Sequence, residues 1–241
     1  MPHIIEFRKR AHEVSRLEAF SDVIFGFAIS LLVVSLEAPK TYEEMLQTLR
    51  GFLPFTICFF IFIMIWWEHH RFFKRYALQD ATTIFLNILL MFVVLFYVYP
   101  LKFMFSLATG QLHGGRGGVP SDGFRILFTV YGIGFTAVFW LLSAMYFHAL
   151  RKSDKLHLNE VERIDTRETM LDTFFMGMFG VVSMALAQSP WWRLAGPVFF
   201  LIAVPKTIIP TIFGRKRRKA EERMMAGASA ASPQNGVNAF S

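Results

Sequence analysis

The residues best suited to chemistry stand at the start of an apolar stretch. Arg16, Ser21 and Asp22 precede residues 23–36, which carry no charged side chain, and Glu37 follows them. The stretch would form about 21 Å of helix, whereas the hydrocarbon core of a bilayer is about 30 Å thick. If this segment crosses a membrane, both carboxylates lie near its edges. Because an ionisable group there is costly unless it is paired or hydrated, we interpret Asp22 as a functional residue.

Two adjacent histidines, His69 and His70, form the other group with chemical potential. They follow Glu68 without the HExxH spacing of a zinc protease, and neighbouring helical residues cannot both face one metal. The apolar stretches contain no nucleophile elbow and no serine–lysine pair, and the glycine-rich residues 110–118 lack the GK[ST] ending of a phosphate loop. We therefore expect that the protein is not an enzyme and that it holds no metal centre and no cofactor. We expect the two histidines to be hydrogen-bonded.

The elements that must position these residues are membrane helices. Hydrophobic residues make up 54% of the 241 residues and charged residues only 18%, against about 25% in a soluble domain. The predicted fold class is all-α, a polytopic membrane protein with six transmembrane helices. Its expected spans cover residues 23–36, 51–67, 81–101, 126–150, 173–192 and 194–214, the last interrupted by Lys206.

The net charge of +7 predicts how these spans are oriented. Six spans place both termini on one side, and nineteen of the 25 Lys and Arg residues would then lie on that side. The positive-inside rule therefore predicts cytoplasmic termini, and nucleic-acid binding is not needed to explain the basicity. We expect a lead-in at residues 1–15, a channel domain at 16–213, and a basic run with a disordered cytoplasmic tail at 214–241. The basic run Arg215–Lys219 has two possible interpretations: it only fixes the membrane topology, or it also binds anionic membrane lipids.

One face of the first apolar helix is a candidate pore lining. At 100° per residue, five residues share a stripe that has one hydroxyl among apolar groups: Val23, Phe27, Ser30, Leu31 and Val34. Such a stripe suits a hydrophobic pore that closes by losing water, and it suits ordinary helix packing equally well.

The residues that precede this stripe carry a family resemblance. The pattern Arg16-x-x-x-Phe20-Ser21-Asp22 resembles the Arg-x-x-x-Phe-Ser-Asp signature of the transmembrane protein 175 family of potassium channels. The pattern from Trp66 through His69, His70, Arg71 and Phe72 is similar to the family's end of the second helix, and Leu86-Asn87 with Leu90 fits the third.

The resemblance implies a homotetramer that conducts monovalent cations, with K+ favoured, in a bacterial plasma membrane. The first helix would line its pore, with a constriction at Phe27 and further layers at Ser30, Leu31 and Val34. Family members usually carry Ile or Leu at the first of these positions and Thr at the second. A hydrogen-bonded network would hold the pore helix in place, formed by Arg16, Phe20, Ser21, Asp22, His69 or His70, and Asn87.

Two features leave alternatives open. Glu37, near the outer end of the stripe, would concentrate cations at a pore mouth if four copies surround an axis, or it is a solvated helix end. The rival function is a non-conducting membrane scaffold or a secondary transporter. A transporter is expected to show inverted repeats and ionisable groups at the membrane midplane. Polar residues within the spans are sparse here, which favours a channel or a scaffold.

Overall fold

The computed structural model describes residues 7–11, 13–34, 41–108 and 121–231, and these ranges form helices and connections without any strand. The helices are α1 (Arg16–Val34), α2 (Tyr42–Tyr76), α3 (Ala81–Ala108), α4 (Ser121–Arg151), α5 (Glu160–Gln188) and α6 (Ala203–Ala231). Two short 3-10 helices, η2 (Trp192–Leu194) and η3 (Pro197–Ile202), join α5 to α6. The predicted all-α class is confirmed.

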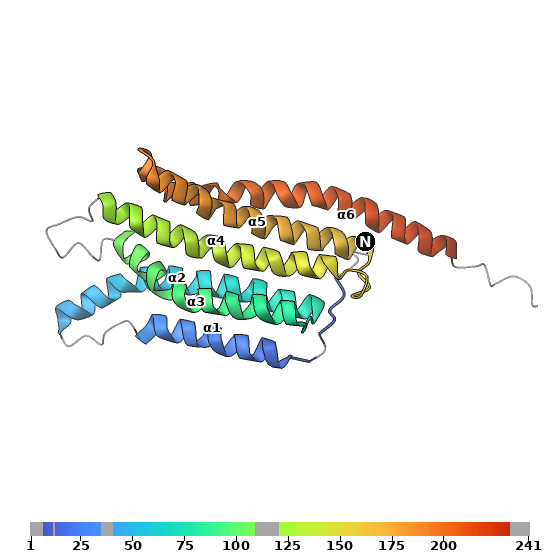
Figure 1. Ribbon diagram of the computed structural model, residues 1–241, viewed down its shortest axis with the longest axis horizontal. Helices are drawn as coiled ribbons and strands as arrows, with labels where there is room; N and C mark the ends of the chain where they lie inside the picture. The colour runs from blue at the N-terminus through green and yellow to red at the C-terminus, as the bar shows by residue number, and fades with distance from the viewer. Residues whose placement is uncertain (1–6, 12, 35–40, 109–120, 232–241) are drawn as a thin grey trace, which may run out of the picture.

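The helices lie side by side in a row, with α1 at one edge and α6 at the other (Figure 1). α1 packs against α2 and α3, α3 packs against α4, and α4 packs most closely against α5. At one end of the row α2 stops and α1, α3 and α5 start, so the polar residues of these termini are brought together there. This end is called the polar end below.

The outer surface of the bundle is apolar. On α3, Phe85, Phe92 and Phe96 are all about two-thirds exposed, whereas Leu90 and Val94 between them are buried. Four segments among the described residues are long and apolar enough to cross a membrane: 81–101, 123–151, 160–188 and 197–226. The chain is therefore a multi-pass helical membrane protein.

Small residues allow α4 and α5 to approach closely. A Cβ added to Gly180 on α5 would lie 2.7 Å from the carbonyl oxygen of Gly132 on α4, which is closer than real contacts allow. Beside this crossing, the hydroxyl of Thr136 donates to the carbonyl of Gly177 at 3.1 Å. Small residues and interhelical hydrogen bonds of this kind are what hold helices together where lipid removes the hydrophobic drive.

The charge that interrupts the last predicted span is paired. The Nζ of Lys206 on α6 lies 2.7 Å from the Oδ2 of Asp172 on α5, so neither charge faces lipid alone. Pro197 starts the irregular part of this span. Residues 197–202 form 3-10 turns, and the α-helical part of the span starts only at Ala203.

Two boundaries differ from those expected from the sequence. The helix that contains the fifth expected span starts before residue 173, because Asn159 caps α5 in a capping box with Glu162 and the helix continues from Glu160. In the segment 214–241, whose disordered part was expected from residue 226, α6 continues as far as Ala231, since the Lys, Arg, Ala, Glu and Met residues favour helix and Arg217 pairs with Glu221 one turn on. Residues 232–241 lie outside the description.

Candidate functional site

The site is built on α1, which starts where the hydroxyl of Ser15 accepts the backbone N–H of Glu18 at 3.1 Å. One face of the helix is buried against α2 and α3 and consists of Glu18, Ser21, Phe25, Ala28 and Leu32. These positions follow spacings of three and four residues, which a helix places on one side. The rotation of α1 about its own axis is therefore set by this stripe.

The opposite face of α1 is largely exposed in the single chain. The side chain of Val23 is 70% exposed and that of Phe27 is 56% exposed, although both are apolar. Ser30 is also exposed, and its hydroxyl donates to the carbonyl of Gly26 in its own helix at 2.9 Å. Leu31 lies half-buried at the flank of this face. The side chain of Val34 and all of Glu37 lie outside the described residues.

A directed chain of hydrogen bonds fixes the buried face of α1. The Nε2 of His69 on α2 lies 2.7 Å from the Oδ1 of Asn87 on α3, and because an amide oxygen only accepts, the histidine is the donor. The amide nitrogen of Asn87 donates to the hydroxyl of Ser21 at 2.8 Å, and Ser21 donates to the carbonyl of Leu17 at 2.9 Å. All three polar side chains are fully buried, so each bond replaces a lost contact with water.

Two further contacts join α1 to α2 beside this chain, with Glu18 and His70 nearer to the polar end and Asp22 and Trp66 farther from it. The indole Nε1 of Trp66 donates to the Oδ1 of Asp22 at 2.8 Å. The Nδ1 of His70 lies 3.2 Å from the Oε1 of Glu18. The rings of Trp66 and His70 stack on each other with centroids 5.5 Å apart, so the two contacts support each other.

The structure thus brings together Ser21, His69 and Asn87 in one network, and places Asp22 and His70 in two contacts beside it. Arg16 and Phe20 are exposed instead, and among the described residues Arg16 has no hydrogen-bond or ion-pair partner. The reason is geometric, because residues 16, 20, 23 and 27 share the free face of α1.

Glu18 was missed in the sequence, and Trp66 was named only as part of the family pattern. They supply the actual partners of His70 and Asp22. Helical spacing could have placed them on the same faces as the other site residues, although it does not give their partners. Glu18 lies three and four residues before Ser21 and Asp22, and Trp66 lies three and four residues before the two histidines.

The fold and the site define a multi-pass helical membrane protein that presents one free, apolar helix face at the edge of its bundle. A family model described as the endosomal/lysosomal potassium channel TMEM175 matches residues 16–97, which carry α1, α2 and most of α3. A potassium channel of Marivirga tractuosa is 35% identical over 236 residues, which cover 91% of this chain and 94% of that protein. The chain belongs to the TMEM175 potassium channel family.

Other relatives agree. A potassium channel of Chamaesiphon minutus is 27% identical over 198 residues, covering 78% of this chain and 91% of that protein. A crystal structure of a variant of the potassium channel MtTMEM175, in complex with a nanobody fusion protein, superposes with a TM-score of 0.76 and 34% identity over 89% of this chain and 98% of that chain. The family expected from the sequence is confirmed, and its members are ion channels rather than enzymes.

Proposed function

We propose that this protein is a potassium channel whose pore is lined by the free face of α1 from four copies of the chain. The observation that carries the proposal is the position of α1 at the edge of the bundle, with Val23 and Phe27 exposed on the side away from α2 and α3. If α1 alone lines the pore, one chain contributes a single wall of it, so several copies must surround an axis. Closed symmetry with four subunits fits this need and agrees with what the family resemblance implies.

Phe27 forms the constriction in this proposal. Four Phe rings around an axis would narrow the path and exclude water, which presents a barrier to a hydrated ion. Ser30 offers hydroxyl oxygens one turn further along, and Val23, Leu31 and Val34 add apolar layers. Because a phenyl ring cannot replace the hydration shell of K+, selectivity would come from the narrowness of the constriction and from the Ser30 layer. Glu37 would form a negative ring at the outer mouth.

In this proposal the buried network holds α1 in one rotational orientation. Ser21 is held by Asn87, and Asp22 is held by Trp66, on the side of α1 that faces away from Phe27. A rotation of α1 would break these bonds inside the protein, where an unpaired polar group costs about 1–3 kcal/mol. The network therefore supports a fixed direction for the Phe27 ring.

The membrane placement follows from the same reasoning. We place α1 and α2 in the bilayer beside the four helices that qualify as spans by length and composition, which gives six spans. The polar end then faces the cytoplasm together with both termini, and the protein lies in a bacterial plasma membrane. The basic residues 215–219 at the end of α6 are exposed with the exception of Arg217, which suits contact with anionic lipids.

Flux into proteoliposomes tests the function directly. Purified protein in liposomes should let K+ pass faster than Na+, down its gradient and without any second substrate, while protein-free liposomes should not. Absence of K+ flux from correctly assembled protein would support the scaffold alternative. Uptake against a K+ gradient, driven by a second ion, would support a transporter.

A further inference from the structure

A basic cavity of about 450 Å³ opens at the polar end, beside the residues that hold α1. It lies between the N-terminal segment, the end of α2, and the neighbouring parts of α5 and α6. Its lining contains five Lys and Arg side chains and a single acid: Phe7, Lys9, Trp67, His70, Arg71, Lys74, Arg75, Asp165 and Arg217.

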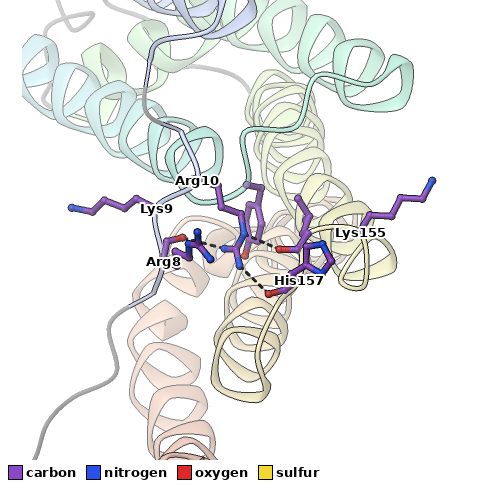
Figure 2. Close-up of a pocket in the computed structure, with 7 residues that line it drawn as sticks. Arg8, Lys9, Arg10, Lys155 and His157 are labelled. Carbon is purple, nitrogen blue, oxygen red and sulfur yellow. Dashed lines mark hydrogen bonds between the residues drawn. The ribbon is translucent and has the colours of Figure 1, made fainter.

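The N-terminal segment that forms one wall is firmly held. The guanidinium of Arg10 makes an ion pair of 2.6 Å with Glu162 on α5 and donates to the carbonyl oxygens of Leu156 and His157 (Figure 2). The backbone N–H of Arg10 also donates to the carbonyl of Lys74 at the end of α2. Lys9 extends to the other side of the segment from Arg10 (Figure 2), and its side chain lines the basic cavity.

Not all of the positive charge in this cavity is neutralised by the protein. Arg71 pairs with Glu68 at 3.1 Å, and Arg217 pairs with Asp165 at 3.4 Å. Neither Lys9 nor Lys74 has an ion-pair partner among the residues that the structure describes. The excess of cations therefore suits a ligand that carries at least one negative charge.

Arg75 adds a buried hydrogen-bond donor that lacks an acceptor among the described residues. Its guanidinium lies over the ring of Phe7, 4.6 Å from the centroid, and its Nη1 is buried with no hydrogen-bond partner in the described chain. A buried guanidinium N–H without a partner is costly, and a phosphate oxygen is the acceptor that Arg binds best. Lys9 and Lys74 at the rim would supply point charges to the same group.

The height of the cavity relative to the membrane indicates the source of that phosphate. Trp67 lines the cavity, is 57% exposed, and ends the charge-free stretch 51–67 of α2, where aromatic residues mark the headgroup region. Arg71 and Lys74 follow within two helical turns, at the level of lipid phosphates.

We propose that this cavity binds the phosphate group of an anionic phospholipid from the cytoplasmic leaflet, with Lys9, Lys74 and Arg75 as its ligands. The site differs from the exposed basic run 215–219, and it rests on the membrane placement proposed above. Its ligand lies against His70, which contacts Glu18 of the pore helix, so an occupied site supports the position of α1.

Thermal unfolding and native mass spectrometry of the full-length protein in detergent test the proposal. Phosphatidylglycerol should bind and raise the melting temperature more than zwitterionic phosphatidylcholine does. The double variant Lys9→Gln/Lys74→Gln should bind phosphatidylglycerol about thirtyfold more weakly, since each basic residue near the surface contributes about 1 kcal/mol. Both side chains lie at the rim, so the variant should fold normally. The matched control Arg218→Gln/Lys219→Gln removes two charges from the exposed α6 run and should weaken phosphatidylglycerol binding less than Lys9→Gln/Lys74→Gln does.

The remaining arms separate the possible outcomes. Stabilisation of the wild type by millimolar inorganic phosphate with phosphatidylcholine, lost in Lys9→Gln/Lys74→Gln, would show the same phosphate site with a soluble ligand. Equal binding of the two lipids would overturn the proposal. So would unchanged binding in the Lys9 and Lys74 variant, or weaker binding in the α6 control alone. Because no ion flux is measured, a protein that binds phosphatidylglycerol but does not conduct would contradict the channel proposal and leave this site standing.

Discussion

Asn87 holds Ser21 from a neighbouring helix: its amide nitrogen donates to the serine hydroxyl across a distance of 2.8 Å, and both side chains are fully buried. The amide oxygen of Asn87 at the same time accepts from His69 on α2, so a single side chain ties α1, α2 and α3 together. A buried hydrogen-bond network between three helices gives α1 one direction, and the free face that carries Phe27 follows from it.

Removal of Asn87 or Ser21 should lower stability. Asn87→Leu leaves the Nε2 of His69 without its acceptor, and Ser21→Ala leaves the amide nitrogen of Asn87 without its acceptor. Each substitution should therefore lower the free energy of unfolding by about 1–3 kcal/mol. Thermal unfolding in detergent measures this, with Ser30→Ala as the control because that hydroxyl is exposed and bonds only within its own helix. Equal melting temperatures for Ser21→Ala, Asn87→Leu and Ser30→Ala would contradict the structural role of the network.

The adjacent tryptophans offer a matched pair. Trp66 donates to Asp22, while Trp67 is mostly exposed. Trp66→Phe keeps an aromatic ring but leaves the Asp22 carboxylate without its donor, so it should destabilise the protein by about 1–3 kcal/mol. Trp67→Phe should change stability by less than about 0.5 kcal/mol. Similar unfolding midpoints for the two variants would show that the Asp22 contact does not hold α1.

Acid stability should depend on Asp80, which precedes α3. Its carboxylate accepts from the hydroxyl of Thr83 at 2.8 Å and lies 2.9 Å from the ring of His148 on α4 and 3.1 Å from the ammonium of Lys152, just after α4. Partial burial would raise the pKa of Asp80, but the contacts with Thr83, Lys152 and His148 outweigh it and hold the pKa well below its usual range.

A carboxylate whose pKa is lowered by folding stabilises the protein above its unfolded pKa of about 4 and loses that contribution as the pH falls further. The melting temperature of the wild type should therefore fall more steeply below about pH 4 than that of Asp80→Asn, which cannot titrate there. Parallel profiles for the two proteins in a pH series would show that Asp80 does not stabilise the contact between α3 and α4.

Much of this arrangement could be predicted from the sequence, because helical spacing and charge-free stretches are local properties. The stripe of Val23, Phe27 and Ser30 was predicted as one face, and the structure leaves that face free. Periodicity alone could not show whether the stripe faces the core, since Ser21, Phe25 and Ala28 form an equally regular stripe on the other side. That choice depends on Asn87 and His69, which come from distant parts of the chain.

The partners of the charged residues were harder to predict. Arg16 belongs to the pattern that resembles a family signature and stands close to Asp22 in the sequence, yet the two side chains leave α1 on different faces. Glu18 pairs with His70, whereas the adjacent His69 binds Asn87. Only the packing of α1 on α2 decides which of the two histidine rings contacts Glu18. Tertiary contacts of this kind have no local signal.

Truncation of Phe27 separates a gate from a core residue. Phe27→Ala should assemble normally, because the ring makes no core contact within its own chain, and should pass K+ faster with poorer discrimination against Na+. The matched control is Phe25→Ala, whose ring is buried beside His69 and whose loss should cost about 3–5 kcal/mol of stability. Collapse of Phe27→Ala, or unchanged flux in a folded variant, would make Phe27 a packing residue.

Cysteine modification at position 27 tests most directly whether the free face of α1 lines the ion path. In a Cys58→Ala background, Phe27→Cys channels treated with a positively charged methanethiosulfonate reagent should lose K+ current. Phe92→Cys on α3, which is similarly exposed in the single chain, should keep its current under the same treatment because we place that side chain in lipid. Loss of current at position 27 alone is the predicted result. Unchanged current in Phe27→Cys after modification confirmed by mass spectrometry would contradict a pore lined by α1.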